Sequence, residues 1–165
     1  KYIFKSKVKN HYEIKEKLLQ QIALIPPNPF KIETNNIQHT DWNLPAAMHR
    51  EYKSLFIKTI SDHLVNMCNE LKLNNYLIGN FWFQQYGENN NHGWHTHPYS
   101  NFANVYFLEC PKGMSTKFKD FTEECEEGDI LSFPAFLPHM SPPIKGNNRK
   151  TIIAFNTDFN IVENK

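Results

Sequence analysis

The sequence has few cysteines and no long apolar run. Its three cysteines, Cys68, Cys110 and Cys125, form no Cys-x-x-Cys pair, which argues against a secreted disulfide framework and against a zinc ribbon. We therefore expect reduced thiols in a cytoplasmic protein. No apolar stretch approaches the roughly 20 residues of a transmembrane helix, so we expect no membrane partner.

An excess of charge of either sign is also missing. The 18 basic and 17 acidic residues give a formal net charge of +1, and the N-terminal lysines form no continuous basic block. Nucleic-acid binding needs a concentrated basic surface, so we expect no nucleic-acid partner. None of these features indicates an oligomeric state.

Hydrophobic periodicity divides the chain into two regions. At 165 residues it has the length of one domain and can bury a core without disulfides. Two segments have helical spacing, one from about residue 10 to Ile25 and one from Ala46 to Leu73. We expect a single domain over residues 1–165, in which residues 1–73 form a helical support and residues 74–165 form a β core.

Beyond residue 73 the apolar pattern changes from helical to strand-like. Runs rich in aromatic and β-branched residues are separated by turns that contain Gly, Pro and Asn. Many short strands with frequent turns indicate a sandwich or barrel. We expect an α+β, mainly β protein, in which N-terminal helices pack on an antiparallel jelly roll. The expected strands are residues 2–8, 76–86, 102–108, 116–121, 130–133 and 150–156.

Three histidines have the spacing of a metal site. His95 and His97 are separated by one residue, so on a β-strand both side chains project from the same face. His139 follows a turn and a short apolar run, and it would supply a third imidazole from elsewhere in the fold. Imidazole suits iron, zinc, copper and nickel. His92 lies in an Asn-rich segment without such a partner, and we expect an ordinary loop residue there.

Further elements accompany these histidines in a fixed order. They are His95-Thr96-His97-Pro98, Val105-Tyr106-Phe107-Leu108, Pro111-Lys112-Gly113, Phe118-Lys119-Asp120, Gly128-Asp129, Phe133-Pro134, Pro138-His139 and Arg149-Lys150-Thr151. Together they resemble the iron(II)- and 2-oxoglutarate-dependent dioxygenases, in particular a bacterial and phage subfamily, over somewhat more than a third of the chain. The resemblance implies a double-stranded β-helix with N-terminal helices, an Fe(II) cofactor, and 2-oxoglutarate and O2 as co-substrates.

The resemblance also implies roles for individual residues. His95 and His139 would be iron ligands, and Arg149 would bind the distal carboxylate of 2-oxoglutarate through its guanidinium fork. Thr151 lies two residues further along the same strand face, where its hydroxyl would reach that carboxylate. Tyr86 falls close to where related enzymes place a tyrosine near the co-substrate; packing at a strand end is the alternative.

His97 departs from the usual pattern of the superfamily, which has a carboxylate at this position. Either His97 is a third ligand, or it stands beside the metal and iron keeps an extra open position. We favour ligation because strand geometry aims His97 at the same point as His95. The substitution removes one negative charge from the metal, and Asp129 or Glu88 are candidates to replace it nearby.

The predicted function is therefore that of an iron(II)- and 2-oxoglutarate-dependent oxygenase that hydroxylates a peptidyl side chain or a small molecule. One alternative is a cupin-like three-histidine oxygenase or isomerase that does not use 2-oxoglutarate. The other is a non-catalytic jelly-roll binding module, in which Arg149-Lys150-Thr151 has no role. No motif identifies the prime substrate. Four aromatic residues are candidates to line the mouth of the barrel, namely Trp82, Trp94, Tyr99 and Phe136.

Overall fold

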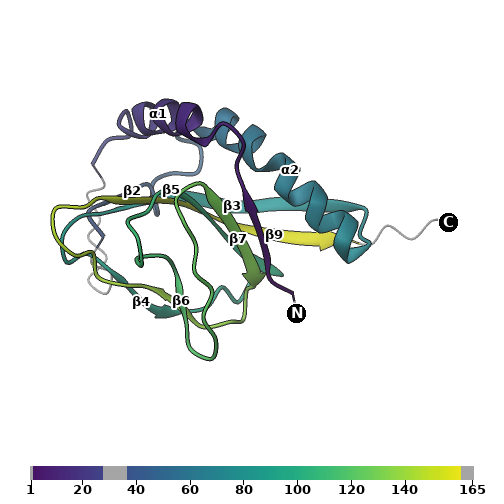
Figure 1. Cartoon of the computed structure of the whole chain (residues 1–165). Helices are drawn as coiled ribbons and strands as arrows, with labels where there is room; N and C mark the ends of the chain where they lie inside the picture. The colour runs from purple at the N-terminus through teal and green to yellow at the C-terminus, as the bar shows by residue number, and fades with distance from the viewer. Residues whose placement is uncertain (1, 28–36, 161–165) are drawn as a thin grey trace.

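The chain forms three layers, two helices and two facing β-sheets (Figure 1). The computed structural model describes residues 2–27 and 37–160. The helices are α1 (His11–Ile22) and α2 (Lys53–Leu71), and both lie over one face of the larger sheet. The strands are β1 (Phe4–Lys7), β2 (His39–Thr40), β3 (Asn75–Tyr86), β4 (His92–His95), β5 (Phe102–Glu109), β6 (Lys117–Phe118), β7 (Asp129–Pro134), β8 (His139–Ser141) and β9 (Lys150–Asn160).

The two sheets are antiparallel throughout. The larger sheet has the strand order β1-β7-β5-β9-β3-β2, and the smaller sheet has the order β4-β8-β6. The smaller sheet lies on the face of the larger sheet that is opposite the helices (Figure 1). The prediction of a mainly β jelly roll with packed N-terminal helices is therefore confirmed.

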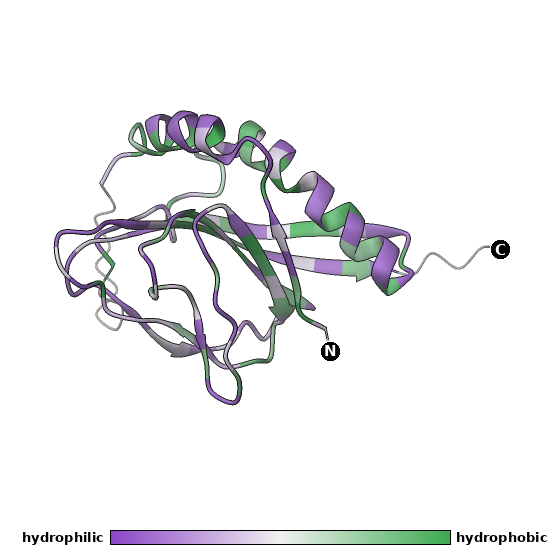
Figure 2. Cartoon of the chain, in the orientation of Figure 1, coloured by the Kyte–Doolittle hydropathy of each residue, from purple (hydrophilic) through white to green (hydrophobic). Residues whose placement is uncertain are grey.

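Alternation along the strands of the larger sheet creates two hydrophobic clusters. In β9, Ile153 and Phe155 pack with Phe56 and Ile60 of α2 in the cluster beneath the helices. Ile152 instead belongs to the cluster between the two sheets. Each side chain of this kind that is fully buried contributes about 1.5–3 kcal/mol through removal from water. Figure 2 shows hydrophobic residues along these strands and an alternation of hydrophobic and hydrophilic residues along α2.

Helix α2 begins at Lys53, seven residues later than the sequence pattern predicts. The preceding segment is turned and is tied to the residues after β2. Arg50 Nε donates to Asp41 Oδ2 at 2.9 Å, and the Tyr52 hydroxyl donates to the same oxygen at 2.6 Å. These polar contacts satisfy a buried carboxylate, and they hold the backbone in a path that a continuous helix would not allow.

Two strands of the smaller sheet were not predicted. β4 and β8 are four and three residues long, too short for a clear alternating pattern. Their pairing places His95 directly opposite His139. Neither helix of the described chain has the length and continuous apolar character that a membrane span requires.

Candidate active site

The three histidines predicted as a metal site come together between the sheets. His95 and His139 face each other across β4 and β8, and their ring centroids lie 4.1 Å apart. One potential ligand atom from each of His95, His97 and His139 lies within 4.8 Å of the others. His97 reaches the cluster from beyond the end of β4, where its backbone N–H donates to Ala135 O at 2.9 Å. Its placement therefore depends on this loop contact, and the strand alternation that we expected does not extend to it.

Hydrogen bonds fix the orientation of all three rings. The Nδ1 atoms of His95 and His139 lie 2.7 Å from Gly93 O and 2.9 Å from Leu137 O, and carbonyl oxygens only accept. His97 Nδ1 lies 2.7 Å from Asn156 Oδ1. Each Nδ1 therefore carries the proton, which leaves each Nε2 lone pair available. This is the donor set that a divalent transition metal requires, so these residues fit such an ion.

Burial keeps these imidazoles in the neutral, ligating form. It lowers the pKa of His95 and of His97, and it lowers the pKa of His139 to about 3 with a further contribution from the neighbouring His95. A metal therefore meets no competing protons at neutral pH.

A fourth histidine, His92, lies against this cluster. Its ring stacks on His95 with a centroid distance of 3.8 Å and an interplanar angle of 10°. An irregularity in the β4–β8 register between His92 and His95 makes this possible, because regular alternation would place residues three apart on opposite faces. His92 is not among the three residues whose potential ligand atoms converge. The expectation of an ordinary loop residue is wrong, since His92 opens β4 and lines the cleft described below.

Lys150, on the face of β9 that it shares with Ile152, places a cation in the interior between the sheets. Its side chain is fully buried, and Nζ donates to Ser141 Oγ at 2.7 Å. The ammonium also lies 5.4 Å from the centre of the Tyr86 ring and 6.0 Å from that of Phe107. Burial lowers the pKa of Lys150 to about 8. No carboxylate among the described residues forms an ion pair with it, so this buried ammonium is an energetic cost that a functional role would explain.

Two residues predicted to bind the co-substrate lie elsewhere. Arg149 is half-exposed, and its Nε donates to Glu109 Oε1 at 2.8 Å. The Thr151 hydroxyl donates to the same oxygen at 2.7 Å. Thr151 shares its face of β9 with Ile153, which packs beneath the helices, so its side chain turns away from the histidines. The structure therefore does not bring Arg149 or Thr151 to the histidine cluster.

Tyr86, in contrast, lies in the interior as expected. It is fully buried, and its hydroxyl donates to Gln84 Oε1 at 2.6 Å. Burial raises its pKa well above the usual value, so the phenol stays protonated. Tyr86, His139 and Ser141 line a narrow cavity of about 30 Å³ beside the histidine rings. Ser141 was not predicted, although it lies two residues after His139 and thus on the same strand face.

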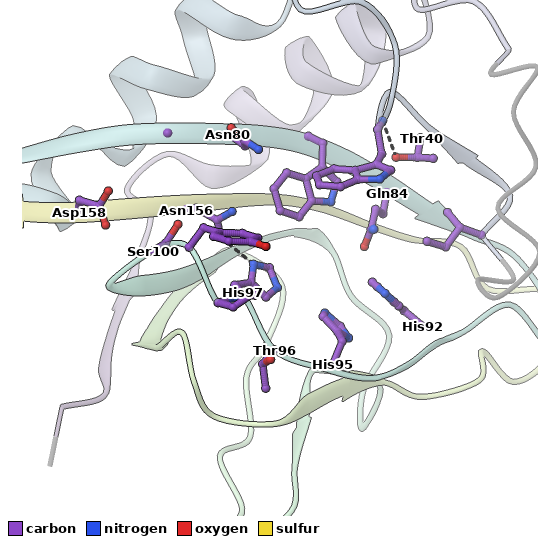
Figure 3. Close-up of a pocket in the computed structure, with 16 residues that line it drawn as sticks. Thr40, Asn80, Gln84, His92, His95, Thr96, His97, Ser100, Asn156 and Asp158 are labelled. Atoms are coloured by element: carbon purple, nitrogen blue, oxygen red, sulfur yellow. Dashed lines mark hydrogen bonds between the residues drawn. The ribbon is translucent and has the colours of Figure 1, made fainter.

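A larger cleft opens beside the histidines (Figure 3). Its volume is about 460 Å³, and His92, His95 and His97 form part of its wall. Of the four aromatic residues predicted at the mouth, Trp82 and Tyr99 line the cleft, whereas Trp94 and Phe136 do not. Asp158 is the one acidic residue among the described residues that line it, and lysine and arginine are absent from that set.

The two acids considered as compensating charges have other surroundings. Asp129 is buried at the start of β7, where it pairs with Lys7 Nζ at 2.9 Å and accepts the backbone N–H of Glu126. Glu88 forms an isolated β-bridge with Ile144. Neither belongs to the described set of residues that line the cleft or the narrow cavity.

No protein-family model and no curated protein sequence matches this chain. Solved structures do match its fold. A viral collagen prolyl hydroxylase from Paramecium Bursaria Chlorella virus-1, in complex with 2-oxoglutarate, has a TM-score of 0.67 and 14% identity over 98% of this chain and 97% of its own. HygX from Streptomyces hygroscopicus, with nickel and 2-oxoglutarate bound, has a TM-score of 0.65 and 10% identity over 94% and 82% of the two chains.

A prolyl hydroxylase from Trichoplax adhaerens, in complex with a peptide fragment of hypoxia inducible factor, also shares the fold. Its TM-score is 0.64 at 14% identity, over 94% of this chain and 83% of its own. Identities this low establish only that this chain shares its jelly-roll fold with these proteins, and leave the activity to be argued from the site.

Proposed function

We propose that this protein is an iron(II)- and 2-oxoglutarate-dependent oxygenase that hydroxylates an organic substrate. The observation that carries the proposal is one interior space with two complementary features. Three imidazoles present unprotonated Nε2 atoms to a common point, and the buried ammonium of Lys150 donates to Ser141, which lies two residues after His139 on β8. A divalent metal and a dicarboxylate are the ligands that this combination suits.

His95, His97 and His139 would hold the iron. The hydrogen bond from His97 to Asn156 supports ligation by His97, because an outer partner on Nδ1 is typical of metal-bound histidines. An all-imidazole set leaves the two positive charges of the metal without compensation from the protein, which favours a dianionic co-substrate at the same centre.

Lys150, in place of Arg149, would bind the distal carboxylate of 2-oxoglutarate. Its ammonium faces the interior, and Ser141 and Tyr86 offer hydroxyl groups beside it. The neighbouring cavity of about 30 Å³ has room for about two water molecules. A five-carbon dicarboxylate therefore enters only when side chains move, and the Lys150–Ser141 hydrogen bond is the contact that its carboxylate would replace.

The iron, when bound, would supply the oxidative decarboxylation of 2-oxoglutarate and the oxygen transfer to the substrate. The protein would supply orientation and the exclusion of water. Lys150 would fix the position of one end of the co-substrate, and the buried aromatic rings of Tyr86 and Phe107 would exclude water from the rest of it. The cleft beside His95 and His97 would admit the prime substrate.

Comparison with solved structures supports the same proposal. The matched viral hydroxylase binds 2-oxoglutarate, and HygX binds nickel and 2-oxoglutarate. The buried lysine also separates this proposal from a cupin-like enzyme that does not use 2-oxoglutarate, and from a binding module without a reaction, because neither gives Lys150 a ligand.

The test is the release of succinate from 2-oxoglutarate by protein loaded with Fe(II) in air. We expect release that depends on iron and that is lost in His139→Ala, with Leu24→Ala, a change at an exposed apolar position, as the matched control. Tight iron binding without succinate, in the presence and absence of candidate substrates, would contradict the proposal.

A further inference from the structure

The outer edge of β3 is open and carries no charge. In the larger sheet, β2 pairs only with Gln84 and Gln85 at one end of β3. Between Asn75 and Trp82, no described strand pairs with the side of β3 that faces away from β9. Unpaired strand edges bind other strands readily, so proteins usually protect them.

The opposite edge of the same sheet shows such protection. β1 is only four residues long and places Lys5 and Lys7 on its exposed positions. The open part of β3 has neither a charged residue nor a proline, and it includes Leu77 with 58% of its surface exposed. The contrast indicates that the β3 edge is kept available for a partner strand.

This edge leads directly into the cleft. Asn80, Trp82 and Gln84 of β3 line the cleft, and Trp82 stacks on His97 with a centroid distance of 5.8 Å. Figure 3 shows Asn80 and Asp158 on neighbouring strands at one end of the cleft, with His95 and His92 toward the other. In Figure 1, β3 and β9 extend well beyond the smaller sheet, which leaves this approach uncovered by it.

A β-bulge divides the open edge into two parts. The register with β9 shifts between Ile78 and Phe81. A bulge ends regular pairing and turns the strand locally, and bulges are common next to active sites. A chain that pairs with Asn75–Ile78 would therefore leave the edge near Asn80, at the entrance to the cleft.

We propose that the prime substrate is an extended polypeptide that adds as a strand to β3 at Asn75–Ile78 and continues into the cleft. The inference rests on the proposed function and specifies its substrate class. Backbone N–H and C=O groups of the substrate would supply affinity without a defined sequence, in the manner of other strand-addition sites. The absence of lysine and arginine from the described lining suits neutral peptide groups and disfavours acidic small molecules.

The geometry also sets the distance between binding and reaction. From Ile78 to Trp82 the partner strand β9 advances only three residues, from Thr157 to Ala154, because the bulge adds one residue to β3; this is about 10 Å, and Trp82 lies against a metal-binding histidine. The oxidised residue should therefore lie about three residues from the part of the substrate that pairs with β3.

The experiment uses two peptide libraries. The first contains N-acetylated, C-amidated peptides of about 12 residues, randomised among neutral amino acids, which is long enough to span both segments. The second is identical but carries N-methyl groups on alternate backbone nitrogens, which removes the N–H donors that strand addition needs. Amide hydrogen exchange of β3 and succinate release by the iron-loaded protein are measured with each library.

We expect the unmodified library to slow exchange at residues 75–78 at least about threefold and to increase succinate release, with little effect from the methylated library. Equal effects of both libraries would overturn the strand-addition mode. If succinate is released without peptide and neither library changes its rate, the proposal of a polypeptide substrate is overturned and the proposed oxygenase activity stands. If succinate never appears, the oxygenase proposal fails, and the exchange measurement still decides whether β3 binds a strand.

A charged residue on the edge provides the matched variant. Leu77→Lys places a lysine on the β3 edge, as Lys5 and Lys7 do on β1, at an exposed position outside the core. This variant should reduce the slowing of amide exchange by the unmodified library at least about fivefold. Leu24→Lys makes the same change at an exposed site two residues beyond α1 and should behave as the wild type. The oligomeric state is measured in parallel by sedimentation. If slow amide exchange in β3 appears only when the protein is a dimer, the edge binds a second copy of the chain and the proposal is overturned.

Discussion

Replacement of Lys150 by methionine should separate stability from co-substrate binding. The side chain is fully buried, and burial lowers its pKa from 10.5 to about 8. A shift of that size corresponds to about 3 kcal/mol of unfavourable free energy for the charged form at neutral pH. Methionine has a similar length and no charge, so it removes this cost and loses the hydrogen bond to Ser141.

We therefore expect Lys150→Met to raise the free energy of unfolding of the ligand-free protein by about 2 kcal/mol, or roughly 4–8 °C in Tm. The same change leaves the distal carboxylate of 2-oxoglutarate buried without a cation. Loss of such a charge-assisted contact costs about 3 kcal/mol, which weakens binding about 150-fold. The variant should thus melt higher and bind 2-oxoglutarate far more weakly.

Arg149→Met is the matched control, because it removes the neighbouring cation that lies on the surface. The Arg149–Glu109 pair is half-exposed on the arginine side and contributes at most about 1 kcal/mol. We expect its affinity for 2-oxoglutarate to stay within about twofold of the wild type. Both affinities are measured by calorimetry with a redox-inert divalent metal. A larger loss in Arg149→Met than in Lys150→Met would refute the assignment.

Three further predictions follow from the same site. 2-Oxoglutarate should bind about tenfold more weakly at pH 9 than at pH 7, because the Lys150 ammonium deprotonates above its pKa of about 8; a flat calorimetric profile would remove Lys150 from binding. Asn156→Leu should weaken metal binding about 10- to 100-fold by removing the acceptor for His97 Nδ1, whereas Asn156→Asp keeps an oxygen there and should retain most of the affinity measured by metal titration. His92→Phe preserves the stacked ring and should still bind one metal ion per chain, and loss of that stoichiometry would add His92 to the ligands.

The sequence supported the prediction of the layers and of the three histidines, because both depend on strong local patterns. The apolar residues of α2 recur at helical spacing, and the long strands β3, β5 and β9 are rich in aromatic and β-branched residues. The start of α2 was missed because the contacts of Arg50 and Tyr52 with Asp41 are tertiary, and tertiary contacts override local propensity.

The proposed co-substrate residue, Lys150, lies one position from the predicted Arg149, and the reason is specific to strands. Side chains alternate between the two faces of a strand, so Arg149 and Lys150 point to opposite faces of the sheet. Assigning the co-substrate to one or the other therefore also decides which of the following residues share its face. Arginine was the plausible choice by geometry, and a buried, unpaired lysine is rare enough to be discounted from sequence alone. His92 was missed for a related reason, since the bulge that aligns it with His95 has no clear sequence signal.

The joint binding of 2-oxoglutarate by the metal and Lys150 is tested most directly by titration of 2-oxoglutarate into metal-loaded wild-type protein and into Lys150→Met under identical conditions. We expect one 2-oxoglutarate to bind per chain in the wild type, dependent on the metal, and binding to weaken about 150-fold in the variant. Binding that persists unchanged in Lys150→Met, or that needs no metal at the three histidines, would contradict it.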